Sequence, residues 1–147
     1  MTVRLLNSPF DPGAELSAFT ASTKSAGAVV SFCGIVRGDG DMTAMEIEHY
    51  PAMTEKALAA HRSKALEIFD VSDALILHRF GRLQVGETIM MVATAAAHRR
   101  AAFDAADFLM DYLKSRAPFW KKEIGADGAT WVAAKDDDEA ALSRWQT

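Results

Sequence analysis

The sequence has a single cysteine, no long apolar run and only a small excess of one charge. Because Cys33 has no second cysteine to pair with, an internal disulfide is excluded, which fits a reducing cytoplasm. No apolar stretch approaches the roughly 20 residues of a membrane span. The first residues, MTVRLLNSPFDPG, contain neither the long apolar region nor the cleavage site of a signal peptide. We therefore expect a cytoplasmic protein without a membrane segment.

The composition is that of a soluble globular protein. Half of the 147 residues are hydrophobic and 24% are charged, so the chain is long enough to bury a core. The net charge of −4 is not basic enough for general nucleic-acid binding. No internal repeat or Pro/Gly/Ser-rich linker divides the chain, so we expect one domain over residues 1–147, with the acidic tail after Ala134 flexible or helical and frayed.

Several motifs of common binding and catalytic sites are also missing. The sequence contains no GxGxxG, GxxxxGK[ST], CxxC or HExxH pattern. Its histidines lie far apart, and no pair has the spacing of metal ligands, so no metal site is expected: His49, His61, His78 and His98. Cys33 lies in an apolar predicted strand and is interpreted as a structural thiol, with a nucleophilic role as the alternative.

The hydrophobic pattern predicts strands and helices in mixed order. Asp11 and Pro12 are typical of a helix start, Thr54 is a candidate cap of a second helix, and Pro118 prevents continuation of a third. That third helix has an expected apolar stripe of Phe103, Ala106, Leu109, Met110 and Leu113. Strands are expected at 3–6, 27–36 (buried), 42–50, 74–80 and 88–97, helices at 11–22, 54–69, 98–114 and 136–147, and a hairpin at 122–134 with Asp127-Gly128 in its turn.

Because strict alternation of strands and helices is absent, we predict an α+β fold with a largely antiparallel sheet and two long helices.

Positive charge gathers beside aromatic residues in the segment YLKSRAPFWKKE. Four cations surround Pro118, Phe119 and Trp120: Lys114, Arg116, Lys121 and Lys122. Cationic neighbours and desolvating aromatic rings favour the neutral amine, so a lysine here can act as a general acid/base or nucleophile. The alternative is a solvated helix exit in which Trp120 only packs.

A second basic group, His98, Arg99 and Arg100, lies where a strand becomes the third helix. Either the arginines pair with Asp104 or Asp107, or they form a phosphate or carboxylate site with the free N–H groups of the helix start. At about 1.5 Å per residue, the two ends of this helix are over ~20 Å apart. The two basic groups therefore belong to separate sites, or to one site shared between subunits.

Three segments resemble one known family. GIVRG, EHYPAMTEKAL and AHRRAAFDAADFLMDYLKSRAPFWKKE are similar to the MoaE family, the large catalytic subunit of molybdopterin synthase, over about residues 27–131. The resemblance implies an α/β-hammerhead fold and a homodimer at the centre of a heterotetramer. Each protomer would bind a small ubiquitin-like sulfur-carrier subunit with a C-terminal Gly-Gly thiocarboxylate. Two such carriers would deliver sulfur to cyclic pyranopterin monophosphate, a pterin substrate, forming molybdopterin without a cofactor.

The resemblance also implies roles for individual residues. Lys114 and Lys121 match the catalytic lysines, and Phe32 and Met110 match apolar pocket positions. The positions that match substrate contacts are Ile35, Val36, Arg37, His98, Arg99, Lys114, Lys121, Lys122 and Glu123. Ile35 stands where relatives often carry lysine, and Ala52 where glycine is common; the tail after Ala134 matches weakly. The competing hypotheses are a non-catalytic pterin- or anion-binding module and a transferase that depends on Cys33.

Overall fold

Two four-stranded sheets form the framework of the computed structural model, which describes residues 3–132, 136–143 and 145. The first sheet has the order β1 (Val3–Leu6), β4 (Val71–Arg79), β6 (Thr88–Ala96) and β2 (Ala28–Ile35). The second has the order β5 (Gly81–Gln84), β3 (Ala44–His49), β7 (Phe119–Gly125) and β8 (Gly128–Trp131). Only β1 and β4 are parallel among the described pairs, so the predicted α+β fold with largely antiparallel strands is confirmed.

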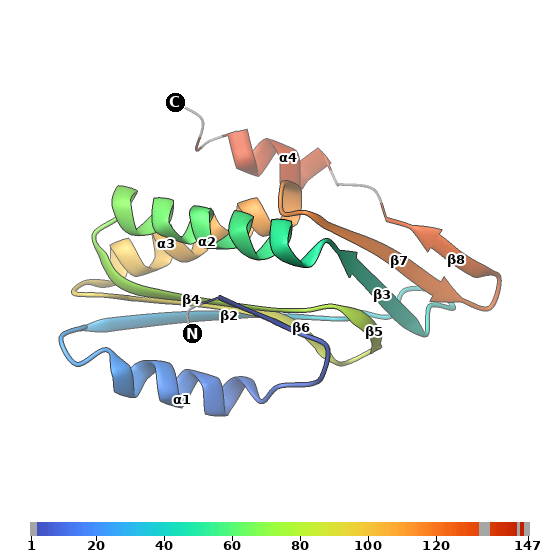
Figure 1. The fold of residues 1–147 in the computed structure, drawn as a ribbon, viewed down its shortest axis with the longest axis horizontal. Helices are drawn as coiled ribbons and strands as arrows, with labels where there is room; N and C mark the ends of the chain where they lie inside the picture. Colours follow the sequence, from blue (N-terminus) through green and yellow to red (C-terminus); the bar gives the residue numbers. More distant parts are fainter. Residues whose placement is uncertain (1–2, 133–135, 144, 146–147) are drawn as a thin grey trace.

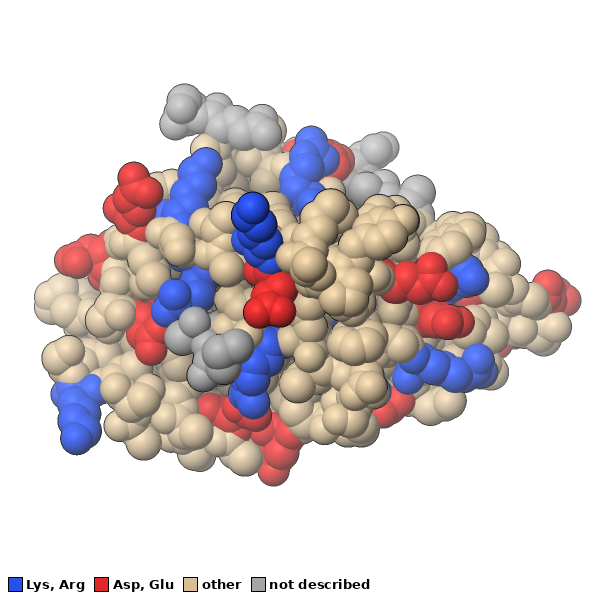
Figure 2. Space-filling view, viewed as in Figure 1, with Lys and Arg blue, Asp and Glu red and all other residues tan. Residues whose placement is uncertain are grey.

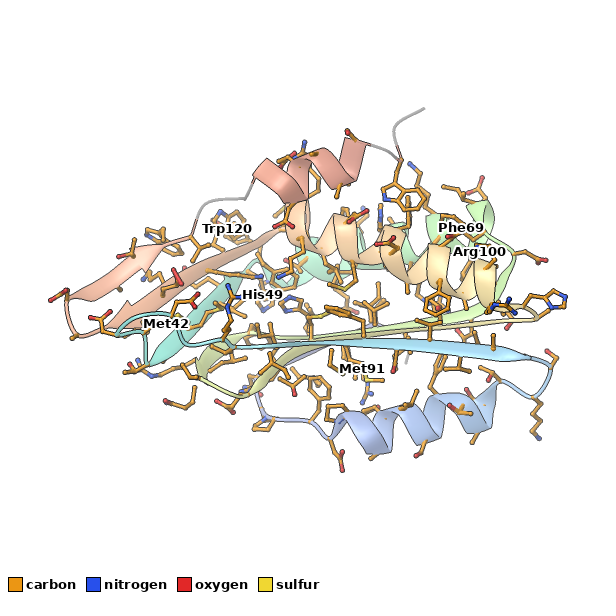
Figure 3. All side chains as sticks on the ribbon, turned by 180° about the vertical axis from the view of Figure 1, so that it is seen from behind. Met42, His49, Phe69, Met91, Arg100 and Trp120 are labelled. Carbon is orange, nitrogen blue, oxygen red and sulfur yellow. The ribbon has the colours of Figure 1, made fainter. Side chains whose placement is uncertain are left out.

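Helices cover both faces of the first sheet, as Figure 1 shows. α1 (Pro12–Ser22) lies on one face, and α2 (Pro51–Ile68) and α3 (Arg99–Ser115) lie side by side on the other. α4 (Asp136–Ser143) packs on α3. One apolar cluster fills the space under α2 and α3, and a smaller one, which includes Met91, lies on the side of α1 (Figure 3). None of the described helices is both long and apolar enough to cross a membrane.

The starts of the first two helices follow different rules. The Asp11 carboxylate accepts hydrogen bonds from the backbone N–H groups of Gly13 (3.0 Å) and Ala14 (3.3 Å), so the predicted cap is confirmed. α2 begins at Pro51, earlier than predicted, because the fixed φ of proline suits a first helical position. Thr54 is therefore not a cap: it is buried, and its hydroxyl donates to the carbonyl oxygen of Pro118 at 3.1 Å.

Two strands differ from the sequence-based expectation. β2 was predicted to be buried but is the edge strand of the first sheet, so Phe32 and Ile35 remain 44% and 58% exposed. Gly81 does not simply end β4. Its φ of +89°, which favours glycine, lets the chain turn directly into β5, a strand that the sequence did not reveal.

Most of the apolar stripe predicted for α3 is confirmed, since Ala106, Leu109 and Leu113 are buried and Met110 is half-buried against the core, and Phe103 is the exception. Phe103 is 54% exposed, whereas small side chains face the sheet and let the helix lie close to it. The buried residues of α3 are Ala102, Ala105, Ala106, Phe108, Leu109 and Leu113. The close approach is fixed where the buried Thr94 hydroxyl donates to the carbonyl oxygen of Ala102 at 2.7 Å. α3 ends at Ser115, before Pro118, as predicted.

The C-terminal region contains a hairpin and a docked helix. β7 and β8 form the predicted hairpin, but its turn is Ala126-Asp127, and Gly128 (φ +107°) opens β8. α4 lies in the predicted terminal helix and is not a free end, since Leu142 is buried and Arg116 pairs with Glu139 at 2.6 Å. The remaining tail positions, 133–135, 144 and 146–147, lie outside the described residues.

Candidate functional site

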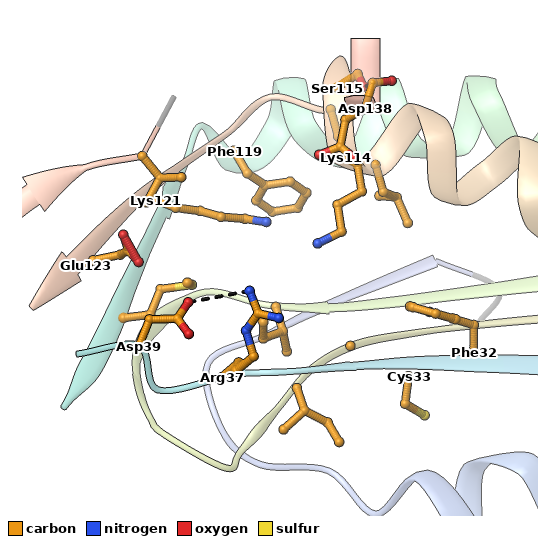
Figure 4. Close-up of a pocket in the computed structure, with 17 residues that line it drawn as sticks. Phe32, Cys33, Arg37, Asp39, Lys114, Ser115, Phe119, Lys121, Glu123 and Asp138 are labelled. Atoms are coloured by element: carbon orange, nitrogen blue, oxygen red, sulfur yellow. Dashed lines mark hydrogen bonds and ion pairs between the residues drawn. The ribbon is translucent and has the colours of Figure 1, made fainter. Parts of the chain in front are cut away.

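A pocket of about 630 Å³ opens where the C-terminal end of α3 meets both sheets. Its walls come from the end of β2 and the loop after it, the last turn of α3, the alternate residues of β7 that face inward, and α4 (Figure 4). Segments that are distant in sequence therefore meet here. The pocket contains most of the basic segment that the sequence singled out.

Three cations from different elements face this pocket. Lys114 extends from the last turn of α3 and Lys121 from β7, and Figure 4 shows their side chains pointing toward one another. Arg37 approaches from the opposite wall, where its guanidinium is 3.4 Å from the Asp39 carboxylate. Both side chains of this pair are largely exposed, so the pair is weak and leaves Arg37 able to bind an anion. The arrangement suits a small ligand with more than one negative charge.

The alternation of β7 separates the neighbouring charges. Lys121 and Glu123 face the pocket, whereas Lys122 points to the other side of the second sheet. There its ammonium lies 4.6 Å from the centre of the Trp131 ring and 4.0 Å from a carboxylate oxygen of Glu48. Lys122, a predicted substrate contact, is thus not among the residues that line this pocket.

The residues predicted at the end of β2 are only partly brought together. Phe32 and Ile35 line the pocket. Val36 is 1% exposed, and both its backbone groups are used: its N–H donates to the Glu87 carbonyl (2.9 Å) and its carbonyl accepts from Gly86 N–H (2.8 Å). Val36 therefore anchors the strand end that presents Ile35 and Arg37. Met110 is half-buried against the core and does not line the pocket.

His98 and Arg99 lie at the opposite end of α3 from Lys114. Both are exposed, and neither lines the pocket. Arg99 and Arg100 form no ion pair within the described part of the chain, including the pairs with Asp104 or Asp107 considered above. α3 has 17 residues, which corresponds to about 25 Å at the usual helical rise. A single chain does not bring the two basic ends together.

Histidine residues behind the pocket were not recognised from the sequence. His78 is 1% exposed, and its ring stacks on Phe119, a pocket residue, with 3.8 Å between ring centres. Burial, followed by the positive charges of Lys121, His49 and Lys114, lowers the pKa of His78 to about 3, against the opposing effect of its hydrogen bond to the Arg79 carbonyl. The available signal was a histidine inside the apolar run ALILHRF, which is typical of a buried strand.

α4 contributes another unpredicted wall. Asp138 lines the pocket beside Lys114, and its carbonyl oxygen accepts a hydrogen bond from the Ser115 hydroxyl at 3.0 Å. The weak sequence match of the tail gave no reason to expect this contact. No group of three or more His, Cys, Asp or Glu residues in the described ranges is placed to hold a metal ion.

Cys33 borders the pocket but points away from it. Figure 4 shows its side chain on the far side of β2, and it packs with the apolar cluster under α1. Burial raises the pKa of the Cys33 thiol, which disfavours the thiolate needed by a nucleophile. This geometry supports the interpretation as a structural thiol.

We expect Cys33→Ser to retain activity within about twofold of wild type, because the side chain points away from the pocket and its raised thiol pKa disfavours a nucleophilic role. Steady-state kinetics of the purified variant would test this. Cys33→Ala serves as a control for the cost of burying a hydroxyl. A folded Cys33→Ser protein without activity, together with an inactive Cys33→Ala protein, would restore the cysteine-nucleophile hypothesis.

One face of the molecule shows the distribution of charge on its surface. On the face shown in Figure 2, Lys and Arg side chains are interspersed with Asp and Glu and form no continuous basic band. The positive side chains in the pocket are therefore a local feature, which favours a small anionic ligand over a polyanion.

Comparison with known proteins identifies the family to which this sequence is similar. Residues 5–116 match the family model described as "MoaE protein". The chain belongs to the MoaE family. The molybdopterin synthase catalytic subunit of Cereibacter sphaeroides is 60% identical over 146 residues, which cover 99% of this chain and 100% of that protein.

Solved structures agree with the fold. The MoaE protein of Burkholderia ambifaria superposes with a TM-score of 0.82 and 47% identity, covering 99% of this chain and 98% of that one. A more distant structure is the complex of subunits 1 and 2 of the molybdopterin-converting factor from Helicobacter pylori (TM-score 0.79, 20% identity, 92% of each chain). At this identity the second comparison supports the fold alone.

Proposed function

We propose that this protein is the catalytic subunit of a molybdopterin synthase, a sulfurtransferase in molybdenum cofactor synthesis. It converts cyclic pyranopterin monophosphate to molybdopterin with sulfur from the C-terminal thiocarboxylate of a small ubiquitin-like carrier protein. The observation that carries the proposal is the convergence of Lys114, Lys121 and Arg37 on one pocket in a chain of the MoaE family. The 60% sequence identity to a molybdopterin synthase catalytic subunit, over 99% of this chain, supports the same reaction.

The charges of the pocket suit both substrates. A thiocarboxylate and a pterin phosphate are anions, and bringing them together costs Coulomb energy unless cations offset it. Arg37 offers a planar fork for phosphate oxygens. Lys114 and Lys121 face the same pocket and would stabilise the negative charge that develops during sulfur transfer. We assign Lys114 to the carrier's terminal glycine and Lys121 to the pterin, each able to donate or accept a proton.

The C-terminal tail of the carrier must also reach Lys114 through a narrow opening. Phe32 and Ile35 on the exposed edge strand β2 form an apolar border beside Lys114, which suits an extended chain ending in two glycines. Glu123 lies in the same pocket and can accept a hydrogen bond from the pterin. The sulfur arrives on the carrier, so the reaction as proposed requires no cofactor.

The proposed assembly is a homodimer of this chain with one carrier on each protomer. It gives His98 and Arg99 a role in the partner's pocket, which α3 prevents them from having in their own. The Helicobacter pylori structure is described as a protein–protein complex of subunits 1 and 2 of the molybdopterin-converting factor, and we propose that this chain likewise binds a second subunit.

The decisive experiment mixes the purified protein with a thiocarboxylated carrier and cyclic pyranopterin monophosphate. Molybdopterin formation, detected as its fluorescent oxidised derivative, supports the proposal. Binding of the pterin without conversion, with a carrier shown to be thiocarboxylated, would identify a non-catalytic binding module instead.

Replacing Arg37 by alanine should raise the KM for the pterin about tenfold or more while lowering kcat less, because a charge-assisted contact to phosphate is made in the ground state as well. Arg37→Lys should recover only part of the loss, since an ammonium lacks the bidentate fork. Arg82→Ala, an exposed arginine of β5 outside the pocket, is the matched control. A fall in kcat alone would assign Arg37 to transition-state stabilisation.

A further inference from the structure

The corner between the two sheets is filled by aromatic and histidine rings. β4 of the first sheet ends at Arg79, and the chain turns at Gly81 into β5 of the second, so His78 lies at the junction. Phe119 opens β7 and stacks on His78 with an interplanar angle of 14°. His49, at the end of β3, lies 6.0 Å from Phe119 and 4.4 Å from Phe80 between ring centres (Figure 3).

Phe119 connects this corner to the pocket. It lies between Lys114 and Lys121 in sequence and shares the inward face of β7 with Lys121. The turn that joins α3 to β7 is fixed by two further contacts: Phe119 N–H donates to the Ala117 carbonyl (2.8 Å), and Thr54 donates to the Pro118 carbonyl (3.1 Å). The Phe119 ring, stacked on His78, therefore lies at the start of β7 beside a turn of fixed geometry that separates Lys114 from Lys121.

His78 is suited to support this ring without adding charge. Its Nδ1 lies 2.8 Å from the Arg79 carbonyl oxygen. A carbonyl oxygen can only accept a hydrogen bond, so Nδ1 is the ring nitrogen that carries the hydrogen when the ring is neutral. The groups that face it, Lys121, Lys114 and His49, all oppose its protonation. A charged ring would add a further cation beside the two lysines, whereas the neutral ring gives a flat surface fixed in orientation by its hydrogen bond.

We infer that His78 is a positioning residue for the candidate site: stacked on Phe119 at the sheet junction, it sets the position of Lys121 relative to Lys114. The expected effect of His78 on turnover rests on the proposed function, but its expected effect on the positions of the two lysines does not. A residue that only stabilised the fold would lower the melting temperature without selectively changing the two lysines or kcat.

The chain provides a matched control in His61. This histidine is also stacked between rings, with 4.5 Å to Phe108 and 3.8 Å to Tyr112 between ring centres, but it joins α2 to α3 away from the pocket. Replacing the half-buried His61 or the fully buried His78 by leucine removes a stacking contact in each case. Only the loss of the His78 ring is expected to change the positions of Lys114 and Lys121.

The first measurement compares kcat for His78→Leu, His78→Phe and His61→Leu. Because small misplacements of reacting groups are costly, His78→Leu should lower kcat on the order of tenfold to a hundredfold, with a smaller change in the KM for the pterin. His78→Phe keeps a flat ring and should recover most of the loss. His61→Leu should retain wild-type kcat. Wild-type kcat in His78→Leu, or no recovery in His78→Phe, would overturn the inference.

The second measurement needs no turnover. Reductive methylation with isotope-labelled methyl groups gives NMR signals for Lys114 and Lys121, which Lys→Arg variants assign. Both signals should shift in His78→Leu and stay unchanged in His61→Leu; unchanged signals in His78→Leu would overturn the inference. If wild-type protein fails to convert the pterin, the proposed function fails, and this measurement still decides the role of His78.

A double-mutant cycle covers the case in which His78→Leu does not fold. Phe119→Leu removes the same stacking contact by replacing the other ring of the pair, which belongs to a half-buried residue. It should shift the two lysine signals in the same way. His78→Gln, which keeps a hydrogen-bond donor but removes the ring, should shift both signals in the wild-type background and add little in the Phe119→Leu background, because the two rings act as one unit. Independent, additive shifts would show that His78 does not act through Phe119.

Discussion

Lys114→Ala protein is expected to fold and dimerise like wild type but to lose turnover by a factor on the order of a hundred or more. The magnitude follows from the usual contribution of a positioned acid/base group. The side chain is exposed at the last turn of α3, so its removal should cost less than about 1 kcal/mol of stability, mainly the interaction with the helix dipole. Steady-state turnover and thermal unfolding measured on the same preparation test both statements.

The control for this experiment is Lys56→Ala, which removes an exposed lysine from α2 at a position that does not line the pocket. It should leave turnover unchanged. Lys114→Arg adds a sharper distinction, because arginine keeps the positive charge but cannot act as an acid/base near neutral pH. If Lys114→Ala keeps activity within a few-fold of wild type, Lys114 has no part in the mechanism. If Lys114→Arg is fully active, the residue contributes charge alone.

The local signals in the sequence predicted most of the secondary structure. Asp11-Pro12, Pro118 and the alternation around Ile47 are short-range effects that act in the same way in any fold, and the corresponding elements are present. The errors arose where tertiary contacts decide. Phe103 matches a helical stripe as well as Phe108 does, but only the position of α3 over the sheet determines which ring is buried.

In the candidate site, too, local sequence signals identified some residues, whereas residues placed by tertiary contacts were missed. Lys114 and Lys121 were identified from charge beside aromatics and from the family resemblance, and the structure brings both to one pocket. The opposite direction of Lys122 follows from strand alternation, once β7 is known to begin at Phe119. His78 and Asp138 could not be identified, because each reaches the pocket region through packing between elements far apart in sequence.

A mixture of Arg99→Ala and Lys114→Ala proteins, each nearly inactive at low pterin concentration, is expected to regain activity if the subunits exchange. α3 separates Arg99 from the Lys114 pocket of its own chain, and Arg99 is exposed. In the proposed homodimer, a composite site would take Arg99 from one protomer and Lys114 from the other. In a heterodimer of the two variants one composite site contains both native residues, and the other contains neither.

The size of the recovery follows from two-fold symmetry. Random exchange makes about half of the dimers heterodimers with one intact site of two, so the ceiling is roughly a quarter of wild-type activity. Exchange is verified by pull-down of differently tagged chains, and the Arg99→Ala/Lys114→Ala double variant mixed with wild type is the matched control. In that mixture every heterodimer site lacks one of the two residues, so exchange should lower activity toward half of the amount present before mixing. Background activity in the first mixture, with exchange demonstrated, would show that Arg99 and Lys114 do not share a site across the dimer.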